Sequence, residues 1–243
     1  MVQIKLSVII PCYNEENRFK EGFSHYISYL KKQKYSWELI LINDGSTDGT
    51  LSLMQTAVVK GKNHIKIIHY ESNKGKGYAI IQGVKLAKGK YILFTDIDHS
   101  VPINTIENFY KFFENGYNVV IGSRRIAQAK IITRQHPTRE FLGRGFTFLV
   151  RVFIDWRIRD ATCGFKTFEN RAAKKIFSKI SIFDWAFDAE ILFLCRKYHL
   201  NFVQAPVSWT NSVGTKVSLK KDILRSLFGL IKIRLNDLIG KYG

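Results

Sequence analysis

Short apolar runs alternate with helix-type patterns along the first half of this 243-residue chain, and this alternation restricts its fold most. Five runs have the length and composition of buried strands: Leu6–Ile10, Glu38–Asn43, Ile65–Tyr70, Tyr91–Thr95 and Asn118–Gly122. Helices are predicted between them, around the apolar face Phe19, Phe23, Ile27 and Leu30, and at Thr50–Lys60, Gly77–Lys88 and Pro102–Asn115. Strands that alternate with helices favour βαβ units. The sequence therefore predicts an α/β fold whose mostly parallel sheet is flanked by helices.

The second half of the chain is strongly basic. Eight arginines lie between Arg124 and Arg159, where only Glu140 and Asp155 oppose them. We predict that this segment is rich in helix. The elements expected after it are a loop or strand at Asp160–Phe168, a helix at Phe187–Tyr198 and a strand at Phe202–Val207.

A final helix is predicted from apolar residues that share one face, namely Leu224, Leu227, Phe228, Ile231 and Leu235. The same helix carries the cations Lys220, Lys221, Arg225, Lys232 and Arg234. A basic amphipathic helix suits the surface of an anionic membrane. The alternative is a helix that packs on its own domain and leaves its basic face in water.

The composition indicates one globular domain. Hydrophobic residues make up 46% of the chain, and no repeat or linker divides it, so we expect a single domain over residues 1–243. Cys12, Cys163 and Cys195 lack metal-ligand spacing, which favours a reducing compartment. We see no secretory signal and no apolar stretch of the roughly 18 to 20 residues that cross a bilayer. We therefore expect a cytoplasmic protein.

The formal net charge of +18 favours polyanionic partners, which include nucleic acid, anionic lipid and phosphorylated substrates. The chain has no helix-turn-helix, zinc or RNA-stacking signature, and its acidic motifs would repel a polyanion. Nucleic acid is therefore not an expected partner. The dinucleotide-binding and P-loop glycine motifs are also absent, which argues against hydride transfer and P-loop chemistry.

Polar motifs follow three of the predicted strands. They are Pro11 to Glu16, Asn43 to Gly49, and Asp96-Ile97-Asp98. Because ligands bind beyond the carboxyl ends of the strands in an open parallel sheet, we expect these motifs to form one site. Asp96 and Asp98 are suited to hold Mg2+ or Mn2+ against a diphosphate. Taken alone, a D-x-D triplet is weak, and a turn or cap is the alternative.

The other strand-end motifs also have two interpretations. Asp44 is suited to accept hydrogen bonds from a nucleobase or a ribose, while Ser46 or Thr47 could simply cap the next helix. The turn from Asn73 to Gly77 offers backbone amides and lysines to a phosphate, and a solvated turn is the alternative. His99, beside the carboxylates, is more typical of an ordinary hydrogen bond than of a metal ligand.

These motifs resemble those of family 2 inverting glycosyltransferases with the GT-A fold, a Rossmann-like fold. The resemblance rests on Ser7 to Glu15, Asn43 to Asp48 and the D-x-D triplet, in this order and at these spacings. It continues through three later motifs, which are Gly122-Ser123-Arg124, Asp160 to Lys166, and Trp185 to Glu190. These resemble the dolichyl-phosphate β-glucosyltransferase branch, which is close to the dolichyl-phosphate mannosyltransferases.

The resemblance implies a role for individual residues. A nucleotide would meet Pro11, Tyr13, Asn14, Glu15, Asp44, Lys76 and Asp96, and the metal would bind Asp96 and Asp98. The acceptor phosphate would meet Arg124, Arg139, Arg144 and Lys166. The catalytic residues would be Asp98, Asp160 and Asp188. Residues 1–123 would then bind the nucleotide-sugar, and residues 124–243 the acceptor.

The expected reaction is inverting transfer of a hexose, glucose from UDP-glucose, to a polyprenyl or dolichyl phosphate. The enzyme would sit peripherally on the cytoplasmic face of a membrane. GDP-mannose as donor, or a soluble or polysaccharide acceptor, are the alternatives within the family. A sugar nucleotidyltransferase would show a glycine-rich basic loop where this chain has Pro11 to Glu16. The chain departs from the branch at Thr162, Ile97, His99 and Ser100, which leaves any further metal ligand open.

Overall fold

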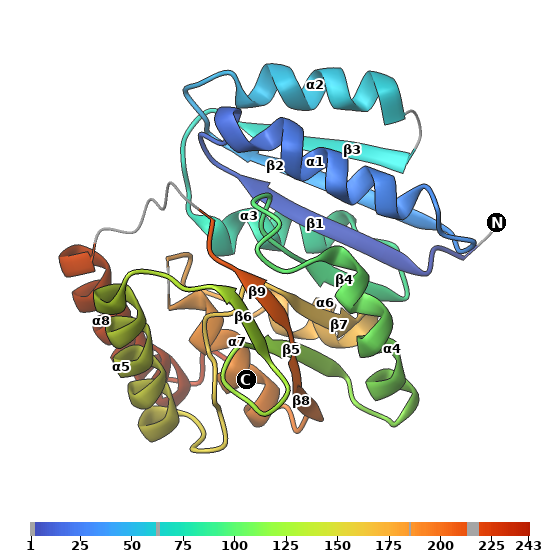
Figure 1. Cartoon of the computed structure of the whole chain (residues 1–243). Coiled ribbons are helices and arrows are strands. Elements are labelled where there is room, and N and C mark those ends of the chain that lie inside the picture. The colour runs from blue at the N-terminus through green and yellow to red at the C-terminus, as the bar shows by residue number, and fades with distance from the viewer. Residues whose placement is uncertain (1–2, 62–63, 185, 213–218) are drawn as a thin grey trace.

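The computed structural model describes residues 3–61, 64–184, 186–212 and 219–243. Its centre is a seven-stranded sheet with the order β3-β2-β1-β4-β7-β5-β8 (Figure 1). The strands are β1 (Leu6–Cys12), β2 (Trp37–Asp44), β3 (Ile65–Tyr70), β4 (Tyr91–Phe94), β5 (Val119–Ser123), β7 (Lys166–Glu169) and β8 (Phe202–Pro206). Strand β7 is antiparallel to both its neighbours, and the other pairs are parallel. The predicted α/β fold with a mostly parallel sheet is confirmed.

Helices cover both faces of the sheet (Figure 1). One face carries α1 (Glu16–Leu30), α2 (Thr50–Gly61) and α4 (Ile106–Glu114), which follows the short 3-10 helix η2 (Ile103–Thr105). The other face carries α3 (Lys76–Leu86), α5 (Pro137–Phe153), α6 (Asn170–Phe177), α7 (Phe187–Lys197) and α8 (Leu219–Leu238). Two hydrophobic cores result, one on each side of the sheet.

Strand β1 shows why the two cores form. Leu6, Val8 and Ile10 point to the core beneath α1, and Ile9, between them, points to the core beneath α3. Successive side chains of a strand point to opposite faces, so a run that is apolar at every position must be covered on both sides. The near-continuous apolar runs of the sequence therefore place this strand at the centre of the sheet.

Two short strands, β6 (Lys130–Thr133) and β9 (Ser208–Thr210), form a separate parallel pair that the sequence did not predict. All four residues of β6 are exposed, so this strand lacks the apolar run by which the buried strands were recognised. The basic segment is therefore part strand and part helix, because α5 follows β6. Within the described residues, no helix is long and apolar enough to cross a membrane.

The predicted C-terminal helix is present as α8, but its apolar residues divide between two environments. Phe228, Ile231 and Leu235 are exposed, whereas Leu230 and Ile233 are buried in the core. The side chains of Leu224, Lys220 and Lys221 lie outside the described part of the structure. Helix α8 thus packs on its own domain and also presents an apolar face outward.

Helix α1 approaches the polar triplet after β4 very closely. A Cβ atom at Gly22 would lie 1.8 Å from the carbonyl oxygen of Ile97. The hydroxyl of Tyr26 donates to the carbonyl oxygen of Asp96 at 2.6 Å and lies 3.0 Å from Oγ1 of Thr95. Glycine at position 22 is therefore what allows α1 to support the Asp96–Asp98 turn.

We predict opposite effects for two glycine-to-alanine substitutions. Gly22→Ala should lower the free energy of unfolding by about 1–3 kcal/mol, because its methyl group collides with backbone. Gly145→Ala should raise it by up to about 1 kcal/mol, because that helical position has no atom within 4 Å of the added Cβ. Urea unfolding of the two variants measures both changes. Equal effects would show that α1 has room to move away from the turn.

Candidate active site

A cleft lies at the carboxyl edge of the sheet and has a volume of about 620 Å3. The structure brings most of the predicted site residues into its lining, although they come from distant parts of the sequence. These are Pro11, Tyr13, Glu15, Asp44, Lys76, Asp96, Asp98, Arg124, Arg139 and Asp188. The structure therefore brings residues of all three strand-end motifs into one cleft.

Asp44 organises the loop between β3 and α3. Its carboxylate accepts hydrogen bonds from the backbone N–H of Lys74 at 2.8 Å and of Gly75 at 3.1 Å, and from Nδ2 of Asn73 at 3.0 Å. Gly75 has a φ of 95°, a conformation that favours glycine. Asp44 is 3% exposed, so its first structural effect is to fix the loop that leads to Lys76.

Asn14 joins the motif after β1 to the motif after β2. Its Oδ1 accepts from the backbone N–H of Thr47 at 2.7 Å, and its own N–H donates to Oγ of Ser46 at 3.0 Å. Asn14 is not among the lining residues of the cleft, so it acts on the geometry of the two loops. Its neighbour Glu15 does line the cleft, where it forms an ion pair with Arg18 at 2.7 Å.

The carboxylate pair after β4 lies on the floor of the cleft. Asp96 forms an ion pair with Nζ of Lys76 at 2.5 Å, and Asp98 accepts from the backbone N–H of Ser100 at 3.0 Å. Burial raises the pKa of Asp98, and the negative charge of Asp96 raises it further. His99 does not join them, because its ring stacks on that of His25 with 4.3 Å between centroids.

Asp96 and Asp98 fit the requirements of a partly solvated divalent cation. Two carboxylates that repel each other favour a bound cation, and Mg2+ ordinarily keeps several ligands for water and substrate phosphate. Among the described residues, no group of three His, Cys, Asp or Glu side chains is arranged to enclose a metal. An open site with two protein carboxylates therefore remains the prediction.

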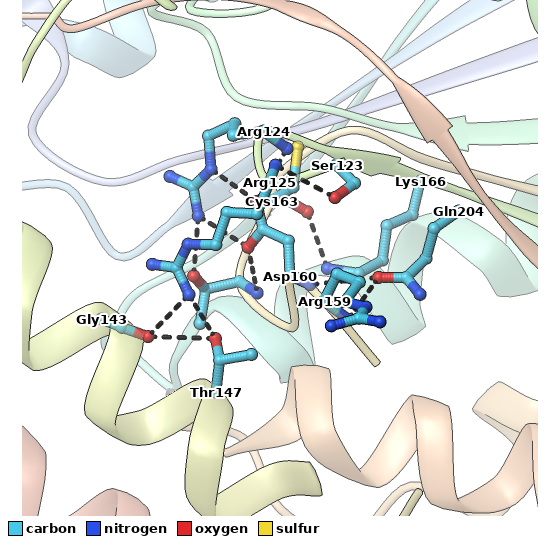
Figure 2. A network of polar contacts seen from close by, with 11 residues as sticks. Ser123, Arg124, Arg125, Gly143, Thr147, Arg159, Asp160, Cys163, Lys166 and Gln204 are labelled. Atoms are coloured by element: carbon cyan, nitrogen blue, oxygen red, sulfur yellow. Dashed lines mark hydrogen bonds and ion pairs between the residues drawn. The ribbon is translucent and has the colours of Figure 1, made fainter. Parts of the chain in front are cut away.

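Arg124 also lines the cleft, and an ion pair with the buried Asp160 holds its side chain (Figure 2). Its Nε and Nη2 atoms donate to the two carboxylate oxygens of Asp160 at 2.7 and 2.8 Å, and its backbone N–H donates at 3.0 Å. Asp160 has no exposed surface. Burial alone would raise the pKa of Asp160. The charge and hydrogen bonds of Arg124 outweigh this effect and hold that pKa well below its usual range. Asp160 is thus placed to orient Arg124.

Lys166 does not lie where the predicted contact with an acceptor requires. It has no exposed surface, and its Nζ donates to Oδ1 of Asp188 at 2.5 Å and to the carbonyl oxygen of Cys163 at 2.7 Å. Asp188 does line the cleft, so the ion pair forms part of its floor. Lys166 starts the antiparallel strand β7, whose position between β4 and β5 buries it.

The predicted phosphate-binding arginines divide between two cavities. Arg139 lines the cleft, whereas Arg144 lines a neighbouring cavity and pairs with Glu140 at 2.6 Å. Arg124 lines both. The two cavities also share Trp209, which sequence reasoning missed because it lies on the short strand β9. Arg18, which also lines the cleft, was missed as well.

Most of the chain matches a known protein family. The model for glycosyl transferase family 2 matches residues 7–177, which contain the three strand-end motifs and Arg124. The chain belongs to glycosyl transferase family 2.

Comparisons over nearly the whole of this chain show which members of the family it is similar to. The chain is 32% identical to a dolichyl-phosphate beta-glucosyltransferase of Dictyostelium discoideum, with 98% of this chain and 76% of the relative covered. It is 33% identical to the protein of that name from Saccharomyces cerevisiae, over 99% of this chain and 77% of the relative. The predicted resemblance to this branch of family 2 is confirmed.

Solved structures support the fold. Glucosyl-3-phosphoglycerate synthase from Mycobacterium tuberculosis, in complex with Mn2+, uridine diphosphate and glucosyl-3-phosphoglycerate, superposes with a TM-score of 0.66. That comparison covers 95% of this chain and 80% of the synthase at 18% identity. The predicted GT-A fold is confirmed.

We predict that the Arg124–Asp160 pair makes stability depend on pH. Asp160→Asn should lower the free energy of unfolding by about 3–5 kcal/mol near neutral pH, because it leaves Arg124 buried without its counter-ion. The folded pKa lies below the unfolded value of about 3.9, so the pair stabilises above that pH and loses its effect as the pH falls further. Urea unfolding should show a constant difference between the two proteins from about pH 7 to about pH 4, and a shrinking difference as the pH falls below about 3.9.

Asp155→Asn is the matched control for this measurement. Asp155 is also buried, but its partner Arg157 is exposed and keeps access to water when the carboxylate is removed. The control should cost less stability than Asp160→Asn. An equal or larger cost would contradict the role assigned to the Arg124–Asp160 pair.

Proposed function

We propose that this family 2 enzyme transfers glucose from UDP-glucose to dolichyl phosphate or another polyprenyl phosphate, with inversion at the sugar carbon. The observation that carries the proposal is the cleft itself, where the carboxylate pair lines one cavity together with Arg124 and Arg139. The carboxylates suit a metal-bound diphosphate, and the arginines suit a phosphate acceptor. The names of the two relatives support glucose as the sugar and dolichyl phosphate as the acceptor.

The donor would occupy the half of the cleft built by residues 1–123. Pro11, Tyr13 and Glu15 would contact the nucleotide from the end of β1, and Asp44 from the end of β2. Asn14 would act indirectly, by joining the two loops through its contacts to Ser46 and Thr47. Lys76, which forms an ion pair with Asp96, would turn toward the diphosphate when a cation takes over that carboxylate.

Asp96 and Asp98 would hold a Mg2+ or Mn2+ ion. When bound, such a cation neutralises charge on the departing diphosphate. The raised pKa of Asp98 means that this carboxylate accepts a proton more readily than an ordinary aspartate. Loss of that negative charge as the pH falls would weaken the site, so activity would decline on the acid side.

The acceptor would place its phosphate against Arg124 and Arg139, in the half built by residues 124–243. A phosphate monoester has a second pKa of about 6 and is largely ionised near neutral pH. Its oxygen therefore attacks without a strong general base, and in-line positioning supplies much of the acceleration. Asp160 would fix the direction of the Arg124 side chain. The negative charge of Asp188 would offset the positive charges of Lys166 and Lys76 at the floor of the cleft.

The enzyme would work at a cytoplasmic membrane surface, because a polyprenyl phosphate is anchored there by its chain. Surface helices would make the contact with the membrane. Helix α8 exposes Phe228, Ile231 and Leu235 beside the basic residues Lys232 and Arg234. An apolar face flanked by cations suits adsorption to anionic lipid.

We predict that Asp98→Asn strongly slows sugar transfer. Radiolabelled UDP-glucose, UDP-N-acetylglucosamine and GDP-mannose would each be offered with polyprenyl phosphate and Mn2+ or Mg2+. Wild type should give a lipid-extractable product from UDP-glucose, and the variant should be slower by roughly 100-fold or more. Glu71→Gln makes the same chemical change at a carboxylate that is 95% exposed, and should retain full activity.

Each other outcome of this assay changes the proposal. If only GDP-mannose gives a lipid product, the donor is GDP-mannose and the proposed acceptor stands. Metal-dependent hydrolysis of UDP-glucose without any lipid product would keep the reaction class and overturn the acceptor. Wild-type activity in Asp98→Asn would remove the carboxylate pair from the mechanism.

We also predict that Arg139→Gln weakens acceptor binding while leaving donor binding intact. The KM for polyprenyl phosphate should rise by roughly 10-fold or more, since a charge-assisted hydrogen bond is lost. The KM for UDP-glucose should stay unchanged. Arg171→Gln removes an exposed arginine from α6 and should alter neither value. A rise in the KM for UDP-glucose alone would contradict the proposal, because it would assign Arg139 to the donor instead of the acceptor.

A further inference from the structure

A second cavity, of about 400 Å3, lies beside the cleft between α5, β6 and β9. Its lining contains six arginines: Arg124, Arg125, Arg134, Arg144, Arg151 and Arg159. In the described part of the chain, Glu140 is the one acidic residue of the lining, and it pairs with Arg144. Asp160, beneath the cavity, compensates Arg124. The cavity therefore keeps a large excess of positive charge.

Neutral groups hold two of these arginines in place. Arg125 donates from Nη1 to the carbonyl oxygen of Gly143 at 3.1 Å and to Oγ1 of Thr147 at 2.8 Å (Figure 2). Arg151 donates from Nε to the carbonyl oxygen of Trp156 at 2.9 Å. Such contacts orient a guanidinium group without neutralising it. Clustered guanidinium groups with neutral partners are suited to bind phosphate oxygens.

The pKa of Arg125 reflects the crowding of positive charges in the cavity. Burial lowers the pKa of its guanidinium, and the nearby charges of Arg124 and Arg144 lower it further, although Asp160 acts in the opposite direction. A bound anion would relieve this repulsion. The arrangement thus favours occupation by a negatively charged ligand.

Exposed apolar side chains border the same cavity. Phe148 and Ile131 belong to its lining, and their side chains are 61% and 42% exposed. Phe141 and Val152 lie seven residues before and four residues after Phe148 on α5, and they are 75% and 66% exposed. Positions spaced in this way share one face of a helix. An arginine cavity beside an exposed apolar stripe matches an amphiphile with a phosphate headgroup.

Helix α8 extends this apolar surface. It packs beside α5 (Figure 1), and its outer residues repeat at intervals of three and four. The exposed set on α8 is Phe228, Ile231, Leu235, Leu238 and Ile239. Soluble monomeric proteins rarely expose contiguous apolar patches of large size, and such patches commonly mark protein or membrane contacts. The adjoining excess of arginine favours a partner whose surface is negatively charged.

We propose that the arginine cavity binds the phosphate headgroup of an anionic phospholipid, while the exposed apolar side chains of α5 and α8 enter the lipid surface. This inference rests on the membrane association proposed above and gives it a specific lipid site. It does not depend on which sugar is transferred. The bound phospholipid would orient the enzyme so that the cleft, which shares Arg124 and Trp209 with the cavity, faces the membrane-anchored acceptor.

A water-soluble phosphate would satisfy the arginines but would leave the apolar stripe exposed. The glycosyl acceptor itself is assigned to the cleft, where Arg139 and Arg124 meet the carboxylate floor. Arg134 and Arg159 line the arginine cavity and do not line the cleft. These two residues therefore separate a docking site from the acceptor site.

The test compares binding of the full chain to vesicles of phosphatidylcholine with and without phosphatidylglycerol, by co-sedimentation in the absence of donor and acceptor. Wild type should bind the anionic vesicles far more strongly than the neutral ones. The double variant Arg134→Gln/Arg159→Gln should bind anionic vesicles about 30-fold more weakly, because each arginine near an anionic surface contributes about fivefold. Phe148→Gln/Val152→Gln should also weaken binding, with the arginines intact.

A matched control separates the site from overall charge. Lys20→Gln/Lys32→Gln removes two exposed cations from the region of α1 and leaves the same net charge as the arginine variant. This control should bind anionic vesicles nearly as well as wild type. Sugar transfer to a short-chain polyprenyl phosphate in detergent, measured in parallel, should be retained by all three double variants. Circular dichroism of each variant verifies that it is folded.

Two results would overturn the proposal. One is equal loss of vesicle binding in the lysine and arginine variants, which would mean that only total charge matters. The other is competition by soluble glycerol phosphate together with unchanged binding in Phe148→Gln/Val152→Gln, which would assign the cavity to a soluble phosphate. Neither result bears on glycosyl transfer in detergent. Conversely, if no glycosyl transfer is found, binding to anionic vesicles would still support the phospholipid site.

Discussion

The ion pair between Arg124 and Asp160 determines how the two sides of the cleft meet. Arg124 directly follows β5, and Asp160 begins the segment that returns the chain to β7. Because Asp160 has no exposed surface, any movement that parts it from the guanidinium would leave a charge buried without compensation. This restricts the return segment to one path and gives Arg124 one direction. Arg124 then lines both the cleft and the arginine cavity, so a single side chain connects the proposed acceptor and docking sites.

The floor of the cleft is also built from paired opposite charges. Asp96 pairs with Lys76, and Asp188 pairs with Lys166. The positive charge of Lys76 also acts to lower the pKa of Asp188. In the free protein the lysines offset much of the negative charge that a diphosphate and its cation would otherwise meet. Asp98, whose pKa is raised by burial and by Asp96, remains without a lysine partner among the described contacts. It is therefore the carboxylate with most to gain from a bound cation, which explains why the proposed mechanism depends on it.

The sequence predicted the strands β1 to β5 and β8 because each is a short apolar run, and parallel strand ends must converge. For that reason Asp44, Asp96 and Asp98 lie in one cleft. Burial of Lys166 could not be predicted, because it depends on the antiparallel insertion of β7 between β4 and β5. Trp209 and strand β6 also escaped prediction, since neither lies in a buried apolar run. The division of Arg139 and Arg144 between two cavities reflects their positions at the start and in the middle of α5, which the count of arginines alone does not reveal.

The most direct test of the proposed function is the anomeric configuration of the product. The full chain would be incubated with UDP-glucose, Mg2+ and a short-chain polyprenyl phosphate, and the purified product would be analysed by NMR. In-line attack by a phosphate held at Arg124 and Arg139 predicts a β-linked glucosyl phosphate from the α-linked donor. An α-linked product would contradict this geometry, and transfer to water alone would show that the arginine side of the cleft does not hold the acceptor.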